Sequence, residues 1–117
     1  LPGMATRSVP ERRMTAEEYV AFELASDVRH EFHDGRVYAA TGGTRARNQI
    51  AGNVATRLRE SARGTGCAVY MVAVRTVLHA GAHYYPDVVT TCDPADDDAD
   101  AVTAPCVVTE VVPAEPG

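Results

Sequence analysis

Apolar residues recur three or four positions apart between residues 46 and 63, and this period predicts an amphipathic helix. The stripe consists of isoleucine, leucine, valine and alanine side chains: Ile50, Ala51, Val54, Ala55, Leu58 and Ala62. Glycines at positions 64 and 66 end the pattern, because glycine is the residue that most often closes a helix.

A shorter helix and a hairpin are expected before this segment. Thr15 and Glu18 have the spacing of a capping box, which predicts a helix from there to about residue 26. Asp34-Gly35 predicts a two-residue hairpin turn, because both positions of such a turn require a positive φ. Phe32 and Val37 are the inward-facing residues expected on its two strands.

The second half of the chain is rich in β-branched residues and predicts three strands, over residues 67–78, 84–92 and 106–112. Pro86 is expected at the beginning of the second strand or on a bulge, where a missing N–H donor is tolerated. The nearly continuous valines of the third strand suggest burial on both faces. The fold class is therefore α+β, with a mixed β-sheet, an N-terminal helix and a hairpin.

The 117 residues are enough for one domain, which we place at residues 14–117. Residues 1–13 are expected to be a disordered tail, in which Leu1-Pro2-Gly3 is a remnant of cloning. No stretch approaches the roughly 18 apolar residues of a membrane span, and the N-terminus lacks the apolar centre of a secretory signal.

The formal net charge of −5 argues against a protein that coats nucleic acid through general basicity. This sum hides an arginine-rich segment at residues 45–63 and an acidic run at residues 93–100. The acidic run lacks the glycine and the terminal glutamate of a calcium loop, so we expect it to be solvated.

The cysteines and histidines do not have the spacing of a zinc site. Cys67, Cys92 and Cys106 form no C-x-x-C pair, and we expect all three to be reduced and buried as small apolar residues. A cytoplasmic location follows from this interpretation. His79 and His83 flank a predicted turn, where solvated loop positions are favoured over zinc binding.

Two acidic residues are the strongest candidates for chemistry. Glu110 lies inside a valine-rich strand, where a carboxylate is costly to bury unless it is paired or binds a metal. Asp87 follows Pro86 on the neighbouring predicted strand, and two such acids can hold Mg²⁺ between them. The alternatives are that Glu110 faces solvent or pairs with Arg75, and that Asp87 only belongs to a turn.

Five stretches of the chain, in order, resemble the Uma-type family of restriction endonucleases, which belongs to the PD-(D/E)XK nuclease superfamily. The matching stretches are Met14 to Tyr19, Arg29 to Val37, Thr41-Gly42-Gly43 with Arg47 to Ile50, Tyr84 to Val89, and Val107 to Val111. The resemblance implies a restriction-endonuclease-like fold and a metal-dependent endonuclease that hydrolyses DNA.

The resemblance also implies roles for individual residues. Asp87 and Glu110 would bind Mg²⁺ or Mn²⁺ and form the catalytic pair. Glu31 matches a recurrent family acid that either lines the site or pairs within the hairpin, and we include it among the catalytic candidates. Asn48 matches the family, which usually has a histidine where Arg47 stands. The arginines from Arg45 to Arg63 either line a phosphate-binding face or form an ordinary solvated helix face, and we take Arg45, Arg47 and Asn48 as the candidates for DNA binding.

The chain departs from the superfamily pattern after Glu110. The superfamily motif has a lysine two residues after the acid, whereas here Val111-Val112 follows, and all 11 basic residues of the chain are arginines. The family helix that would carry a lysine is missing, which suggests a C-terminally truncated domain. A second hypothesis is therefore an inactive relative that binds nucleic acid or self-associates, and exposed apolar strands lead us to expect a homodimer.

Overall fold

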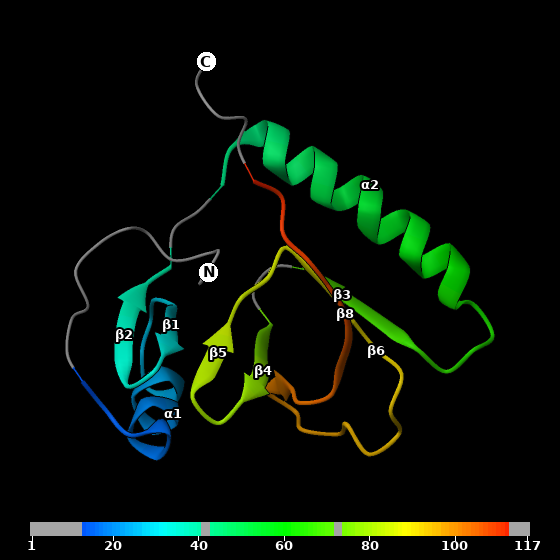
Figure 1. The fold of residues 1–117 in the computed structure, drawn as a ribbon. Coiled ribbons are helices and arrows are strands. Elements are labelled where there is room, and N and C mark those ends of the chain that lie inside the picture. The colour runs from blue at the N-terminus through cyan, green and yellow to red at the C-terminus, as the bar shows by residue number, and fades with distance from the viewer. Residues whose placement is uncertain (1–12, 41–42, 72–73, 113–117) are drawn as a thin grey trace.

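The computed structural model describes residues 13–40, 43–71 and 74–112, in which two helices and two β-sheets are present (Figure 1). All but the last residue of the expected N-terminal tail lies outside the described residues. The elements in chain order are α1 (Ala16–Leu24), β1 (His30–His33), β2 (Arg36–Ala39), α2 (Arg45–Ala62), β3 (Ala68–Met71), β4 (Arg75–His79), β5 (Ala82–Tyr84), β6 (Val88–Thr91), β7 (Ala101–Val102) and β8 (Pro105–Thr109).

The five-stranded sheet has the order β2-β1-β5-β4-β7, and it is antiparallel except for the β4–β7 pair. The β1–β2 hairpin turns at Asp34 and Gly35, whose φ angles are 49° and 83°, as the sequence predicts. The capping box at the beginning of α1 is likewise confirmed. The core between α1 and this sheet contains Met14, Tyr19, Phe32 and Val37.

The three-stranded sheet has the order β3-β6-β8 and is antiparallel throughout. Helix α2 lies against β3 and β6, and its buried residues Ala51 and Ala55 meet Val69 and Val88 in a second core. The small alanine side chains allow the helix to approach the sheet closely. The apolar stripe is thus confirmed, except that Ile50 near its N-terminal end is 48% exposed.

Two predicted strands are each divided between the sheets. The segment at residues 67–78 forms β3 in one sheet and β4 in the other, and the segment at residues 84–92 forms β5 and β6. Pro86 lies at the second division, because its backbone has no N–H to continue a ladder. The short strand β7, directly after the acidic run at residues 93–100, was not predicted.

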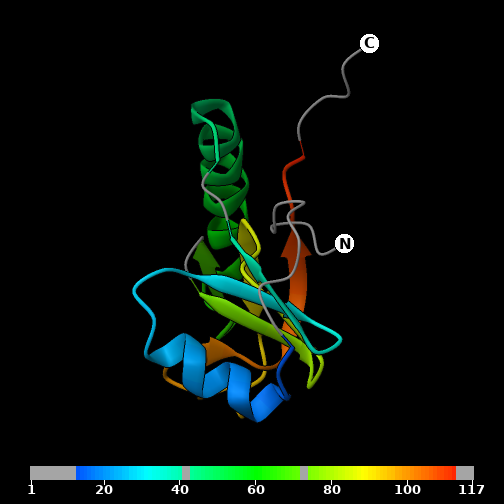
Figure 2. The same cartoon turned by 90° about the vertical axis from the view of Figure 1, so that its left-hand side faces the viewer.

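Strand β8 is not buried on both faces, so this expectation is wrong. Val107 and Val108 are 41% and 43% exposed, although they point to opposite faces of the strand. Figure 2 shows β8 (orange) on the side of the three-stranded sheet away from α2 (green), so the helix leaves it uncovered. A run of valines indicates a strand, but it does not determine whether another element covers that strand.

The expectation of three reduced, buried cysteines is also wrong. Cys67 and Cys92 form a disulfide, and Cys106 is a free, exposed cysteine. Cys92 is exposed as well, and Cys67 is half-buried. Spacing along the chain did not reveal this pairing, because the register of β3 against β6 brings the two residues together.

Two side chains that we expected in solvent are instead held by the fold. Asp96 accepts hydrogen bonds from Thr91 Oγ1, Thr103 N and Ala104 N at 2.7–2.9 Å. His83 is buried, with Nδ1 2.8 Å from Arg75 Nη1 and Nε2 3.1 Å from the carbonyl oxygen of Ala80. Because the guanidinium can only donate, this geometry corresponds to a neutral His83 that donates from Nε2.

Candidate active site

Asp87 lies where the chain passes from the five-stranded to the three-stranded sheet, one residue before β6 begins. Its side chain is almost completely buried. Arg47 Nε donates to both carboxylate oxygens, at 3.1 and 3.2 Å, and the backbone N–H of Val111 donates to Oδ2 at 2.7 Å. One carboxylate therefore joins the first turn of α2, the beginning of β6 and the segment that follows β8.

Glu110 comes directly after β8 and is half-buried. Burial and the nearby charge of Asp87 raise the pKa of the Glu110 carboxyl to about 7, and the positive charge of Arg47 only partly offsets this. Because Val111 is hydrogen-bonded to Asp87, the two acidic residues belong to one connected site. Of the alternatives for Glu110, pairing with Arg75 is not what the structure shows, since Arg75 lies against His83.

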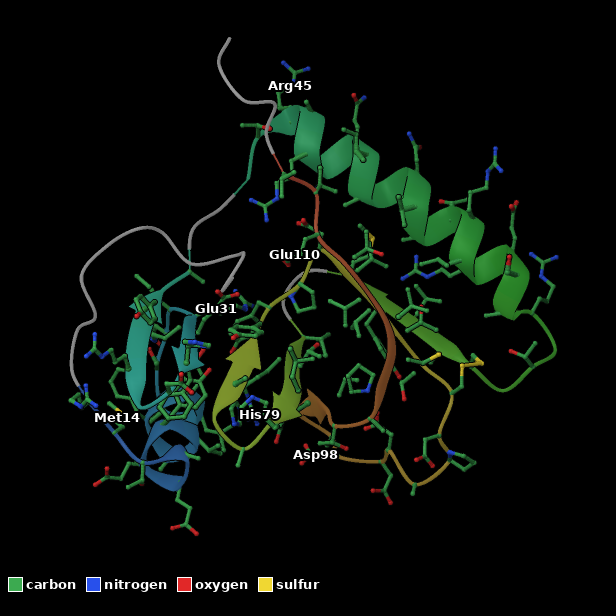
Figure 3. The ribbon with its side chains drawn as sticks, viewed as in Figure 1. Met14, Glu31, Arg45, His79, Asp98 and Glu110 are labelled. Atoms are coloured by element: carbon green, nitrogen blue, oxygen red, sulfur yellow. A yellow bond between two sulfur atoms is a disulfide. The ribbon has the colours of Figure 1, made fainter. Side chains whose placement is uncertain are left out.

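Glu31 is placed in β1, beside this junction, and is fully buried. Its Oε2 accepts a hydrogen bond from the backbone N–H of Tyr85 at 2.9 Å, two residues before Asp87. Figure 3 shows Glu31 in the five-stranded sheet and Glu110 beyond β8, both toward the middle of the molecule. Glu31 is thus in a position to fix the backbone that presents Asp87.

A buried hydrogen-bond network around the Tyr85 hydroxyl was not predicted from the sequence. The Tyr85 hydroxyl donates to Glu23 Oε2 at 2.5 Å, and His30 contacts the same carboxylate through its backbone N–H and Nδ1 at 2.8 and 3.0 Å. Burial and the Glu23 hydrogen bond raise the pKa of Tyr85. The Tyr19 hydroxyl also donates to the backbone carbonyl oxygen of His30. The sequence signal for this network was the spacing of Tyr19 and Glu23, which are four residues apart and so lie on the same helix face.

The three candidates for DNA binding separate into two groups. Arg45 and Asn48 are exposed and line a pocket of about 520 Å³ at the N-terminus of α2, together with Gly43, Thr44, Ala46 and Gln49. Arg47 instead turns inward to Asp87, and only its backbone N–H is used in the cap, where it donates to Thr44 Oγ1. The beginning of α2 therefore presents one arginine outward and one toward the acid pair.

The residues around Asp87 provide oxygen donors and an excess of negative charge once Glu110 is ionised. Two carboxylates and one guanidinium meet there. Within the described ranges, no group of three or more His, Cys, Asp or Glu side chains is arranged to hold a metal ion. The acid pair still fits an ion such as Mg²⁺, which uses one or two protein carboxylates and keeps several waters.

The mixed α+β architecture is compatible with a restriction-endonuclease-like fold. Residues 16–115 match the model of the Uma2 family, described as "Putative restriction endonuclease", and the chain belongs to this family. The matched region includes the acid pair, Glu31 and the beginning of α2.

A curated relative supports the same grouping. It is a Synechocystis protein described as "Uncharacterized protein slr1290", 30% identical over 107 residues, which cover 90% of this chain and 56% of the relative. The chain thus spans little more than half the length of that protein. In the part of the chain that the structure describes, neither helix is long and apolar enough to cross a bilayer.

Proposed function

We propose that this protein is a metal-dependent endonuclease that hydrolyses phosphodiester bonds in DNA, with Asp87 and Glu110 as the metal-binding acids. The observation that carries the proposal is the 2.7 Å hydrogen bond between Val111 N and Asp87 Oδ2. This bond fixes the segment that bears Glu110 against the segment that bears Asp87, although the two acids are 23 positions apart in the chain. Membership of the Uma2 family supports the nuclease class.

The metal in this proposal is Mg²⁺ or Mn²⁺. When bound, it supplies charge stabilisation for a scissile phosphate and lowers the pKa of a coordinated water. Asp87 is already held in place by Arg47 and Val111, so little side-chain freedom is lost when it binds a cation. Glu110 has its pKa raised to about 7, so it releases a proton when a cation binds below that pH.

Arginine side chains and the N-terminal end of α2 would bind the DNA backbone. Arg45 and Asn48 line the open pocket at the beginning of α2, where the positive end of the helix dipole also favours anions. Arg47 contacts Asp87 from the same turn. We assign to Arg47 an electrostatic role at the scissile phosphate, while proton transfer by this residue is excluded because arginine stays charged.

Glu31 has a positioning role in this proposal. It contacts the Tyr85 backbone, and Tyr85 in turn is anchored by Glu23. Together these bonds hold the turn around Pro86 from the side of the five-stranded sheet. Loss of the Glu31 carboxylate would misplace Asp87 without removing a metal ligand.

The second candidate is an inactive family member that only binds nucleic acid. Two observations favour it: Val112 stands where the superfamily motif has a lysine, two residues after the acid, and the Arg47 guanidinium already neutralises Asp87. Both candidates share the pocket at the beginning of α2, so they differ in metal binding and in cleavage. These two properties decide between them.

The test combines Mn²⁺ titration calorimetry with cleavage of supercoiled plasmid at pH 8. Wild type is compared with Asp87→Asn, Glu110→Gln and the exposed-helix control Glu60→Gln. We expect wild type and the control to bind Mn²⁺ and nick DNA, and the first two variants to lose at least about 100-fold in rate. Cleavage that survives both substitutions overturns the assigned site. Absence of both Mn²⁺ binding and cleavage in the folded wild type supports the inactive binding module.

A further inference from the structure

Three cysteine sulfur atoms lie together at one end of the three-stranded sheet. The Cys67–Cys92 disulfide links the residue before β3 to the residue after β6. Cys106, in β8, has its Sγ 3.8 Å from the Cys92 Sγ. Cys92 is therefore flanked by a bonded sulfur on one side and a free thiol on the other.

The strand registers explain why these residues meet. Ala68 pairs with Thr91, so Cys67 and Cys92 are the next antiparallel pair, with their Cα atoms 4.0 Å apart. On the other side of β6, the ladder slips by one residue. Thr90 pairs with Val107 and Thr91 with Pro105, which leaves Cys106 as the extra residue of a β-bulge. A bulge redirects its side chain, and here the thiol points to Cys92.

We propose that the three cysteines form an intramolecular thiol–disulfide exchange site in which Cys106 is the nucleophile and Cys92 the central sulfur. The Cys106 thiolate attacks Cys92 Sγ, so that a Cys92–Cys106 bond forms as the Cys67–Cys92 bond breaks. The electron pair of the broken bond leaves with Cys67 Sγ, which takes up the proton that Cys106 lost. The numbers of disulfides and of thiols stay constant, so no external oxidant or reductant is needed.

Exchange moves the covalent link from one side of β6 to the other. In the observed form the link joins the two strands that α2 covers, and in the exchanged form it joins β6 to the uncovered edge strand β8. Cys106 is exposed and is the thiol open to modification before exchange, whereas the half-buried Cys67 takes its place afterwards. The inference does not depend on nuclease activity, because none of the three cysteines belongs to the proposed site.

Peptide mapping of the folded, oxidised wild-type protein tests the proposal. The protein is incubated between pH 6 and 8.5, quenched in acid and denatured, and its free thiol is trapped with N-ethylmaleimide. Cleavage after Arg75 and before Asp93 puts the three cysteines on separate peptides. We expect label on both Cys106 and Cys67, with an approach to equilibrium that becomes faster as the pH rises, because the thiolate is the attacking species. Label confined to Cys106 at every pH over several hours overturns the proposal.

Two matched variants give an independent readout. After mild oxidation, Cys67→Ser should form Cys92–Cys106 and retain less than a tenth of its free thiol, while Cys106→Ser should form Cys67–Cys92. A folded Cys67→Ser protein that keeps both thiols, under conditions that fully oxidise Cys106→Ser, contradicts the exchange. Circular dichroism verifies folding, and the wild-type mapping decides the matter where a variant does not fold.

Discussion

Arg47 and Asp87 form a buried ion pair, in which Nε lies 3.1 Å from Oδ1 and 3.2 Å from Oδ2. The pair ties the first turn of α2 to the point where the chain crosses between the two sheets. It also places a fixed positive charge beside the acid pair that we propose to bind metal. The same arginine can thus stabilise the fold and compete with a cation, and these two effects can be measured separately.

Replacing Arg47 by methionine should lower stability and raise metal affinity. The buried Asp87 carboxylate loses its charged partner, and because Arg47 is 19% exposed we expect a loss of about 1–3 kcal/mol in the free energy of unfolding. Removal of the competing charge should tighten Mn²⁺ binding about three- to tenfold. Urea unfolding and calorimetry give the two values. The exposed helix residue Arg57, changed to methionine, is the control, and weaker Mn²⁺ binding in the Arg47 variant would contradict the competition.

Glu110 should make stability depend on pH and on metal. Its pKa is about 7 in the folded protein against 4.5 for an ordinary glutamate, so between these values the folded state holds the extra proton. The contribution is fully present below pH 4.5 and is lost as the pH rises through 7. Glu110→Gln should therefore match wild type near pH 4 and be more stable than wild type at pH 8.

Thermal unfolding from pH 4 to 8 checks this behaviour, with Glu60→Gln as a control that follows wild type throughout. Added Mn²⁺ should raise the midpoint of wild type at pH 8 and leave that of Glu110→Gln unchanged, since a ligand stabilises only the state that binds it. A Glu110 variant that is less stable than wild type at pH 8 would show that this carboxylate stabilises the folded state.

Asp96 should stabilise the acidic run at residues 93–100, whereas its neighbour Asp97 should contribute little to stability. Partial burial opposes its charge, but hydrogen bonds from Thr103, Thr91 and Ala104 outweigh this and lower the pKa of Asp96 to about 2. Asp96→Asn should cost about 1–2 kcal/mol at pH 7, because charged acceptors form the stronger hydrogen bonds. Asp97→Asn, on an exposed side chain, should cost nearly nothing.

The pH dependence gives a second check on Asp96. Its pKa lies below the ordinary value of 3.8, so its contribution is present above that pH and is lost as the pH falls toward 2. The difference in unfolding free energy between wild type and Asp96→Asn should therefore shrink in acid. Equal stability of the two proteins at pH 7 would mean that the segment is held by other contacts.

The homodimer expected from the sequence stays a prediction, and the exposed edge strand β8 is where it can be tested. Val107 and Val108 leave apolar surface on both faces of a strand that pairs only with β6 in the described sheet. Sedimentation velocity at micromolar concentration should show a dimer for wild type and a monomer for Val108→Glu. Thr56→Glu, on the exposed face of α2, is the control, and a monomeric wild type would refute the prediction.

Local patterns determined the elements whose formation depends on neighbouring residues. The capping box at Thr15, the turn at Asp34-Gly35 and the alanine face of α2 are all present, because their geometry is set within a few positions of the chain. The separation of β5 from β6 also follows from a local cause, the missing donor of Pro86. The sequence left open which sheet each of these strands joins.

In the candidate site, too, short sequence patterns predicted some features and the tertiary structure decided others. The sequence identified Asp87 and Glu110 from one dipeptide and one carboxylate within a valine run, and family resemblance added Glu31 and Arg47. The cysteine expectation was wrong because the disulfide depends on the register between strands that are distant in the chain. The interpretation of Arg47 as a DNA contact stays a prediction, and it did not include the direction in which the side chain leaves the helix, toward Asp87.

The sequence by itself determined the α+β class, the positions of most helices and strands, and the acidic residues that merit attention, since these depend on short-range periodicity and residue chemistry. Only the tertiary structure decided that Arg47 pairs with Asp87, that Val111 binds the same carboxylate, and that three cysteines meet at one sheet end. The physical reason is that such contacts depend on strand order and register. These are fixed when the two separate cores pack, and no local pattern in the chain encodes them.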